Sequence, residues 1–206
     1  MSAASCPQFH PRQLDRRRRS PQNYEMALFA RSVADERAAL LTFLAQQRDA
    51  LRASVLGLTD EQARATPTVS SLSLGGLVKH CARGERRWVI AGIAGEQLPG
   101  LWPPDDWAAD FRLEPEETLA AVLSYYAETA ERTEQVVTGI TDLGEPTALD
   151  KEHSVRWVLL TLIKEIARHA GHADILREAL DGQLAGALDR AYDAAQALLA
   201  GGLAEE

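Results

Sequence analysis

Cysteine is scarce in this chain, whose 206 residues contain two, Cys6 and Cys81. Two distant cysteines cannot build a disulfide framework or a Cys-x-x-Cys metal site, so we expect a protein of a reducing compartment, the cytoplasm. Cys81 falls within a helical pattern. We interpret it as a small core hydrophobe, with a redox or catalytic role as the alternative.

Long apolar runs are also missing. No segment approaches the roughly 20 apolar residues that span a bilayer, and the first residues lack the apolar stretch of a secretory signal. We therefore expect no membrane partner. The chain has no internal linker rich in Pro, Gly or Ser, which favours one folded domain, and no strand-like alternation competes with its helical patterns.

Positive charge is scarce beyond the N-terminus. Residues 1–20 carry five arginines and one aspartate, whereas the remainder carries 17 basic and 29 acidic residues. An acidic body repels phosphate backbones, so Arg16–Arg19 would have to bind nucleic acid alone, and we expect no nucleic-acid partner. We predict a disordered, Arg-rich tail over residues 1–30, and a translation start at Met26 instead of Met1 stays open.

Helical periodicity is what the sequence does contain. Apolar residues recur at three- and four-residue intervals in four segments. These are expected at about 33–57, 73–89, 115–139 and 154–180. Ser32 is placed to start the first helix, Pro115 lies in the first turn of the third, and Gly182 ends the fourth. The pattern predicts an all-α four-helix bundle over residues 31–182 with long connections.

Two further segments concern the surroundings of this bundle. The segment 95–113 is rich in Pro and Gly and is predicted to be a long irregular connection, held by Trp102 and Trp107 and able to wall a pocket. An Ala- and Leu-rich pattern predicts an additional C-terminal helix within residues 183–206. That helix would pack on the bundle or on a second subunit, so a homodimer stays open.

One polar stripe on the fourth helix carries chemistry. At 100° per residue, Glu165, His169 and His172 lie at about 0°, +40° and −20° on the helical wheel, so they share a face with core-type leucines. A metal ion satisfies a buried carboxylate and imidazoles together. His80, on the second helix, is the candidate third ligand, and the spacing of His172 from His169 suits either a fourth ligand or a group that contacts the ligands. In the alternative, His80 and His169 are hydrogen-bonded core histidines and Glu165 pairs with Lys164 or Arg168.

Two motifs carry a resemblance to a known family. Ser73-Leu-Gly-Gly-Leu-Val-Lys-His80 resembles the second-helix motif of the actinobacterial branch of the DinB-like superfamily, and Ala167-Arg-His169-Ala-Gly-His172-Ala-Asp174 resembles its fourth-helix motif. The resemblance extends from about Asp35 to Gly182. It implies a DinB-like bundle with a divalent metal held by His80, Glu165 and His169. With Glu at position 165, the fourth-helix motif resembles that of the mycothiol-dependent maleylpyruvate isomerases.

Thiol chemistry is the function that this resemblance implies, with mycothiol as cosubstrate and an electrophile as its partner. In such a transferase or isomerase, His172 would transfer a proton, and Arg83 or Arg87 would bind a carboxylate of the thiol or its acceptor, unless these arginines form a solvated face. Zn or Ni fits the mixed N and O ligands. A non-catalytic metal-binding stress or ligand-sensing protein and a metal-assisted hydrolase stay as alternatives.

Overall fold

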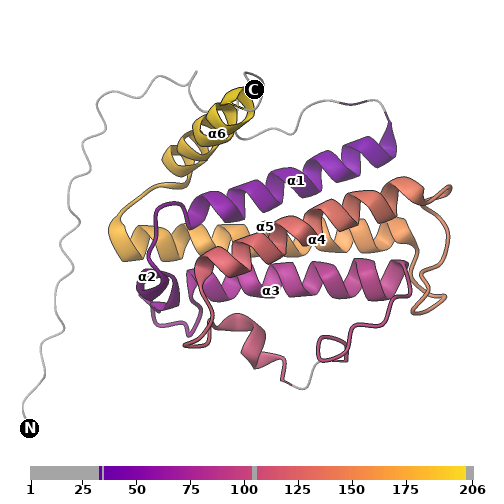
Figure 1. Ribbon diagram of the computed structural model, residues 1–206, viewed down its shortest axis with the longest axis horizontal. Helices are drawn as coiled ribbons and strands as arrows, with labels where there is room; N and C mark the ends of the chain where they lie inside the picture. The colour runs from indigo at the N-terminus through magenta and orange to yellow at the C-terminus, as the bar shows by residue number, and fades with distance from the viewer. Residues whose placement is uncertain (1–32, 34, 104–105, 203–206) are drawn as a thin grey trace, which may run out of the picture.

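Helices form most of the computed structural model, which describes residues 33, 35–103 and 106–202 (Figure 1). The elements in chain order are α1 (Glu36–Ser54), α2 (Asp60–Arg64), α3 (Leu74–Arg86), the π-helix η2 (Arg87–Ile93), the 3-10 helix η3 (Ala108–Phe111), α4 (Leu119–Gly139), α5 (Val155–Asp181) and α6 (Ala185–Gly202). The fold is the all-α, DinB-like bundle that the sequence predicts.

Four of these helices make the bundle. In Figure 1, α1, α3, α4 and α5 run side by side, and α1 and α3 each pack against both α4 and α5. Leucine, valine and isoleucine fill the space between them, among them Leu44, Leu51, Leu77, Leu159 and Ile166. Because the chain runs in opposite directions in α3 and α5, residues near the end of one helix face residues near the start of the other.

Side-chain caps explain where the helices start. The side chains of Asp35, Thr59, Ser73, Thr118 and Ser154 each accept a hydrogen bond from a backbone N–H of the first turn, which satisfies a donor that the helix leaves free. Helix α5 ends at Gly182, whose φ of 77° is the left-handed conformation that glycine adopts without strain.

The third helix begins later than predicted. Pro115 lies in a turn in which the N–H of Glu117 donates to the carbonyl of Glu114, and α4 starts after the Thr118 cap. The first helix starts after Asp35, while Ser32, the start that we predicted, lies outside the described residues. The predicted tail over 1–30, with Cys6, Arg16–Arg19 and Met26, also lies outside them.

The additional C-terminal helix, α6, lies beside the end of α1 that leads to α2 in Figure 1 and packs on α1. Leu188 of α6 is buried. The more distal Leu198 and Leu199 are exposed. Whether a second subunit covers them stays a prediction. Cys81 is buried in the core, where burial raises the pKa of its thiol, so the thiol stays protonated at neutral pH.

A buried ion pair crosses the bundle. Arg48 of α1 donates to both carboxylate oxygens of Glu85 in α3, at 3.0 and 2.7 Å, and the hydroxyl of Thr133 in α4 donates to the same carboxylate at 2.6 Å. Arg48 and Glu85 are both at most 1% exposed. The network ties three of the four helices together through groups that cannot reach water.

The connection between α3 and α4 is anchored by cations on α3 and at the start of η2. Lys79 donates to the backbone carbonyl of Arg112 at 3.2 Å, Arg83 lies 2.6 Å from Asp110, and Arg87 pairs with the same carboxylate. Trp107, which the sequence suggested as an anchor together with Trp102, is 57% exposed, and the guanidinium of Arg87 lies over its ring. Charge and apolar burial both hold the connection, because Asp110 is buried beside two arginines and leucines of the connection are buried as well.

Two glycines let this connection approach α3. A Cβ at Gly75 would overlap the side chain of Leu113, and a Cβ at Gly76 would overlap the backbone carbonyl of Phe111. Their hydrogen side chains therefore allow η3 to lie directly on the first turn of α3.

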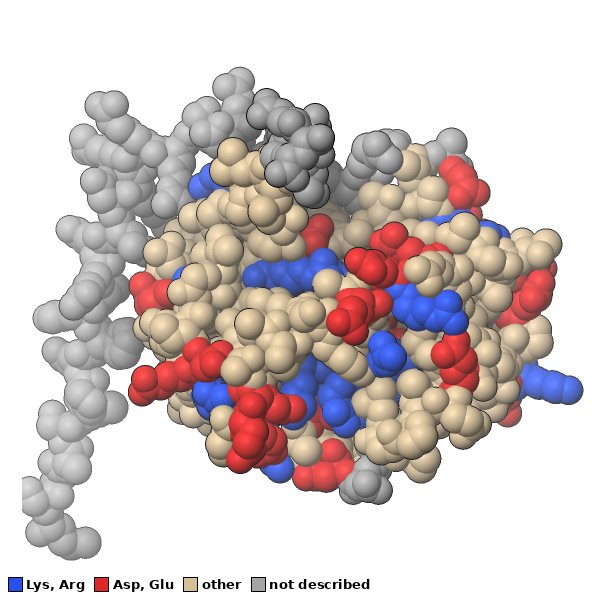
Figure 2. All heavy atoms as spheres, in the orientation of Figure 1, with Lys and Arg blue, Asp and Glu red and all other residues tan. Residues whose placement is uncertain are grey.

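Charges of both signs are intermixed on the molecular face in Figure 2. Lys or Arg side chains there lie next to Asp or Glu side chains. In the described part of the chain, no helix combines the length and the apolar character that crossing a membrane requires.

Candidate metal centre

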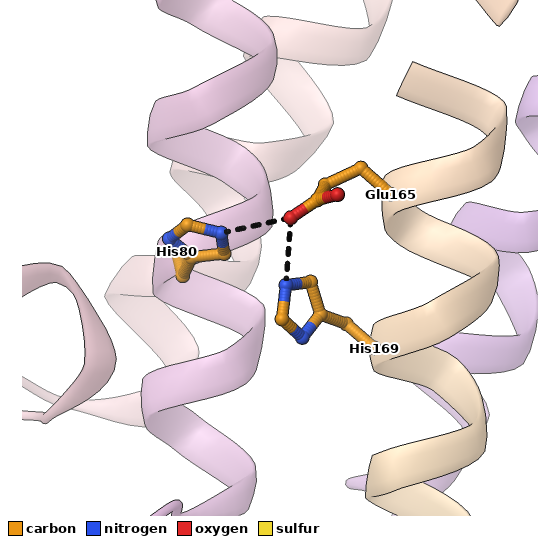
Figure 3. Close-up of side chains that lie close together, drawn as sticks. All are labelled: His80, Glu165 and His169. Carbon is orange, nitrogen blue, oxygen red and sulfur yellow. Dashed lines mark hydrogen bonds and ion pairs between the residues drawn. The ribbon is translucent and has the colours of Figure 1, made fainter. Parts of the chain in front are cut away.

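The predicted ligands come together between two helices. His80 projects from α3, and Glu165 and His169 project from α5 one turn apart, so all three side chains point toward one another (Figure 3). Packing holds the two helices at this distance, because the leucines and valines beside these polar residues are buried in the core. The sequence-predicted set is therefore a spatial cluster.

Both imidazoles point at a single carboxylate oxygen. Oε1 of Glu165 lies 3.2 Å from Nε2 of His169 and 3.9 Å from Nε2 of His80. The three ligand atoms lie within 4.8 Å of one another. Ligand atoms around a tetrahedral zinc ion are about 3.4 Å apart, because zinc lies about 2.1 Å from its nitrogen and oxygen ligands. Small side-chain rotations would close this set around one cation, so the residues fit a divalent metal.

Burial keeps both imidazoles in the neutral form that binds a cation. The pKa of His80 is lowered from 6.5 to about 4, chiefly because the ring is desolvated and secondly because His169 lies nearby. Desolvation also lowers the pKa of His169, although Glu165 partly opposes the shift. Both rings are therefore neutral at pH 7, and a neutral imidazole carries the lone pair that a metal needs.

The second nitrogen of each ring is unpaired. Nδ1 of His80 and Nδ1 of His169 are buried and have no hydrogen-bond partner among the described residues. Metal-binding histidines usually have a polar group that fixes the ring through this nitrogen. At His80, an aromatic contact orients the ring instead: the side chain of Phe111 stacks on the imidazole, with centroids 3.9 Å apart and planes at 19°.

His172 stands beside the cluster. Its ring centroid is 5.5 Å from that of His169, and its Nδ1 is buried with no partner among the described residues. It is not one of the three residues whose ligand atoms lie within 4.8 Å of one another. Its place suits a group that acts next to the metal ligands.

Arg83 and Arg87 already have a carboxylate partner. Both pair with Asp110, and Nε of Arg87 also donates to the carbonyl of Leu101 at 2.8 Å. Arg87 is buried, whereas the side chain of Arg83 is 30% exposed. Of the two, Arg83 has the access to solvent that contact with a bound molecule requires.

The alternative partner of Glu165 also lies nearby. Oε2 of Glu165 is 4.0 Å from Nζ of Lys164, at the outer limit of an ion pair, while Oε1 faces the histidines. One oxygen of the Glu165 carboxylate thus faces the histidines, and the other faces Lys164. A separate cavity of about 510 Å³ between α1, α4 and α6 is lined by other residues, including Arg52 and Tyr192, and contains none of the predicted site residues.

Two residues that contact the predicted site residues, Asp110 and Phe111, were not predicted from the sequence. They lie in the connection that we predicted to wall a pocket, but no spacing singles them out. The available signals were the Gly75-Gly76 pair, which indicates a close backbone approach, and the recurrence of Lys79, Arg83 and Arg87 at four-residue intervals on α3.

Comparisons with known proteins indicate the family. The model of the mycothiol-S-transferase family matches residues 39–182, a range that includes His80, Glu165 and His169. A crystal structure of a conserved protein from Enterococcus faecalis is similar, with a TM-score of 0.59 and 18% identity over 73% of this chain and 100% of the other. At that identity, the likeness shows the fold alone. Proteins with curated descriptions gave no significant match.

Proposed function

This chain belongs to the mycothiol-S-transferase family, within the DinB-like proteins, and from that premise we propose that it transfers a low-molecular-weight thiol to an electrophile. In the reaction, the thiol loses its proton, its sulfur forms a bond to an electrophilic carbon, and the leaving group departs with its electron pair. The observation that carries the proposal is the cluster of His80, Glu165 and His169, whose ligand atoms lie within 4.8 Å of one another.

These three side chains would hold a divalent cation, with Zn or Ni as the proposed ions. Such a cation lowers the pKa of a thiol, so that the nucleophilic thiolate exists at neutral pH. Three protein ligands leave a coordination position open, which is typical of catalytic sites. The carboxylate would supply the negative charge of the ligand set, and the neutral imidazoles would supply lone pairs.

His172 is the proposed proton acceptor. Its ring lies beside His169 without being part of the three-ligand cluster, and its Nδ1 has no partner among the described residues. Arg83 is the proposed contact for a carboxylate of the thiol or acceptor, because its side chain is partly exposed while it remains paired with Asp110.

The experiment is a product assay. Protein loaded with Zn or Ni is incubated with mycothiol and monobromobimane, and the thioether is quantified by mass spectrometry against the uncatalysed reaction. We expect a thiol-dependent rate that His169→Ala abolishes. A non-catalytic binding protein would give no rate above background, and a hydrolase would consume an ester substrate equally well without thiol, so either result would overturn the proposal.

A further inference from the structure

A second cluster of rings lies at the other end of the same helix pair. The indole of Trp157, at the start of α5, has its centroid 3.9 Å from the imidazole of His153 and 5.6 Å from the indole of Trp88. Trp88 lies in η2, which directly continues α3. Trp157 is 41% exposed although it is a large aromatic residue, so one side of this aromatic cluster, Trp88, His153 and Trp157, faces solvent.

The aromatic cluster has ring nitrogens that remain available for hydrogen bonds. Nδ1 of His153 lies 2.9 Å from both carboxylate oxygens of Asp150, and this hydrogen bond lowers the pKa of Asp150. Since the carboxylate oxygens of Asp150 accept hydrogen bonds, Nδ1 of His153 is the donor of this pair, and in the tautomer protonated at Nδ1 the other ring nitrogen, Nε2, is an acceptor. Within the described residues, neither this Nε2 nor the two indole N–H groups have a hydrogen-bond partner.

The aromatic cluster and the metal centre are aligned along the same two helices. Trp88 follows His80 by eight residues, and Trp157 precedes Glu165 by eight residues, which corresponds to about 12 Å on each helix at 1.5 Å per residue. Gly84 lies midway on α3, and a Cβ added there would meet no atom within 4 Å. Space therefore remains beside α3 between the two sites.

We propose that the aromatic cluster binds a polyhydroxylated ring, the sugar or cyclitol part of the thiol whose sulfur reacts at the metal centre. Mycothiol consists of an acetylated cysteine joined by an amide to an amino sugar, which carries a cyclitol. From ordinary bond lengths, its sulfur is roughly 12 Å from its second ring. This inference rests on the proposed function, and it assigns a binding site to the end of the thiol that lies away from the sulfur.

Complementary chemistry supports this ligand class. Sugar rings present C–H groups that pack on aromatic faces, while their hydroxyl groups need hydrogen-bond partners of both kinds. Here two indole N–H groups donate and the His153 Nε2 accepts. The carboxylate of Asp150 also accepts hydrogen bonds from the backbone N–H groups of Glu152 and His153, so the turn before α5 holds the imidazole in place while 41% of the Trp157 side chain remains exposed to a ligand.

The test separates ring binding from thiol chemistry. Saturation-transfer NMR on metal-free protein with the thiol-free fragment, glucosaminyl inositol, should give a signal that Trp157→Ala abolishes. Leu160→Ala, a change at another exposed apolar residue of α5, serves as the matched control and should retain the signal. No signal with the parent protein, or equal signals with both variants, would overturn the inference.

Kinetics give an independent readout. Trp157→Ala, and separately His153→Phe, should raise the KM for mycothiol at least fivefold while leaving the KM for N-acetylcysteine unchanged, since the latter has no sugar. An equal rise for both thiols, or a change confined to the electrophile, would contradict ring binding by this cluster. If N-acetylcysteine and mycothiol both failed to react while the fragment bound, the proposed transferase function alone would be wrong.

Discussion

The ring of Phe111 lies flat against the imidazole of His80, with centroids 3.9 Å apart and planes at 19°. Because Nδ1 of His80 has no hydrogen-bond partner among the described residues, this stack supplies orientation that no hydrogen bond to Nδ1 provides. Phe111→Ala should therefore weaken metal binding about tenfold, the effect typical of losing a group that orients a ligand. Competition with a chromophoric chelator measures the affinity. Phe43→Ala, at an exposed phenylalanine of α1, is the control, and equal affinities in both variants would contradict this role.

Gly76 should be intolerant of a side chain. A Cβ there would overlap the carbonyl of Phe111, so Gly76→Ala must displace η3 from α3. Hydrogen exchange of the backbone amides of residues 108–113 should accelerate, and the metal affinity should fall with it. Gly84→Ala is the matched control in the same helix. Its new Cβ meets open space, so we expect a gain of about 0.5–1 kcal/mol in stability from helix propensity.

The Arg48–Glu85 pair should be required for folding stability. Glu85→Gln leaves a buried guanidinium without its counter-charge, which typically costs about 3–5 kcal/mol. Urea denaturation measures the loss. Glu134→Gln removes a carboxylate that is 57% exposed and 3.8 Å from the same arginine, and it should cost less than about 1 kcal/mol. Similar losses of unfolding free energy in the two variants would show that the buried pair contributes no more to stability than the exposed carboxylate.

Acid should destabilise the metal-free protein through its ligands. The pKa of His80 is lowered to about 4 and that of His169 is also lowered, whereas both are about 6.5 when unfolded. Between these values the unfolded chain binds more protons, so stability falls as the pH drops from about 6.5 toward 4. His80→Gln should lose less Tm than the parent between pH 7.5 and 5, with a chelator present. An equal loss would contradict the lowered pKa.

Local patterns account for the parts of the fold that were predictable. The bounds of α5 follow from the Ser154 cap and Gly182, which are neighbours of the helix in sequence. The start of α4 was placed too early, because Pro115 and Thr118 are both good start signals and the side-chain cap of Thr118 prevails. The proposed ligands on α5 follow from helical spacing. His80 was proposed because the third ligand has to come from another helix, and the resemblance to a known motif implies the same residue.

The unpredicted features depend on contacts between distant segments. Arg48 and Glu85 each look like solvated helix residues until three helices enclose them. Arg83 and Arg87 were predicted to meet a carboxylate of a ligand, and in the structure they meet that of Asp110. Helical spacing specifies neither the partner nor the fold of a connection as long as that between α3 and α4.

Metal content is the most direct test of the three-ligand centre. Untagged protein would be analysed by elemental mass spectrometry as purified and after reconstitution with Zn or Ni, together with His80→Ala, Glu165→Gln and His169→Ala. We expect close to one ion per chain in the parent and a clear loss in each variant that remains folded by circular dichroism. A folded parent that takes up no metal, or full metal retention in all three variants, would contradict it.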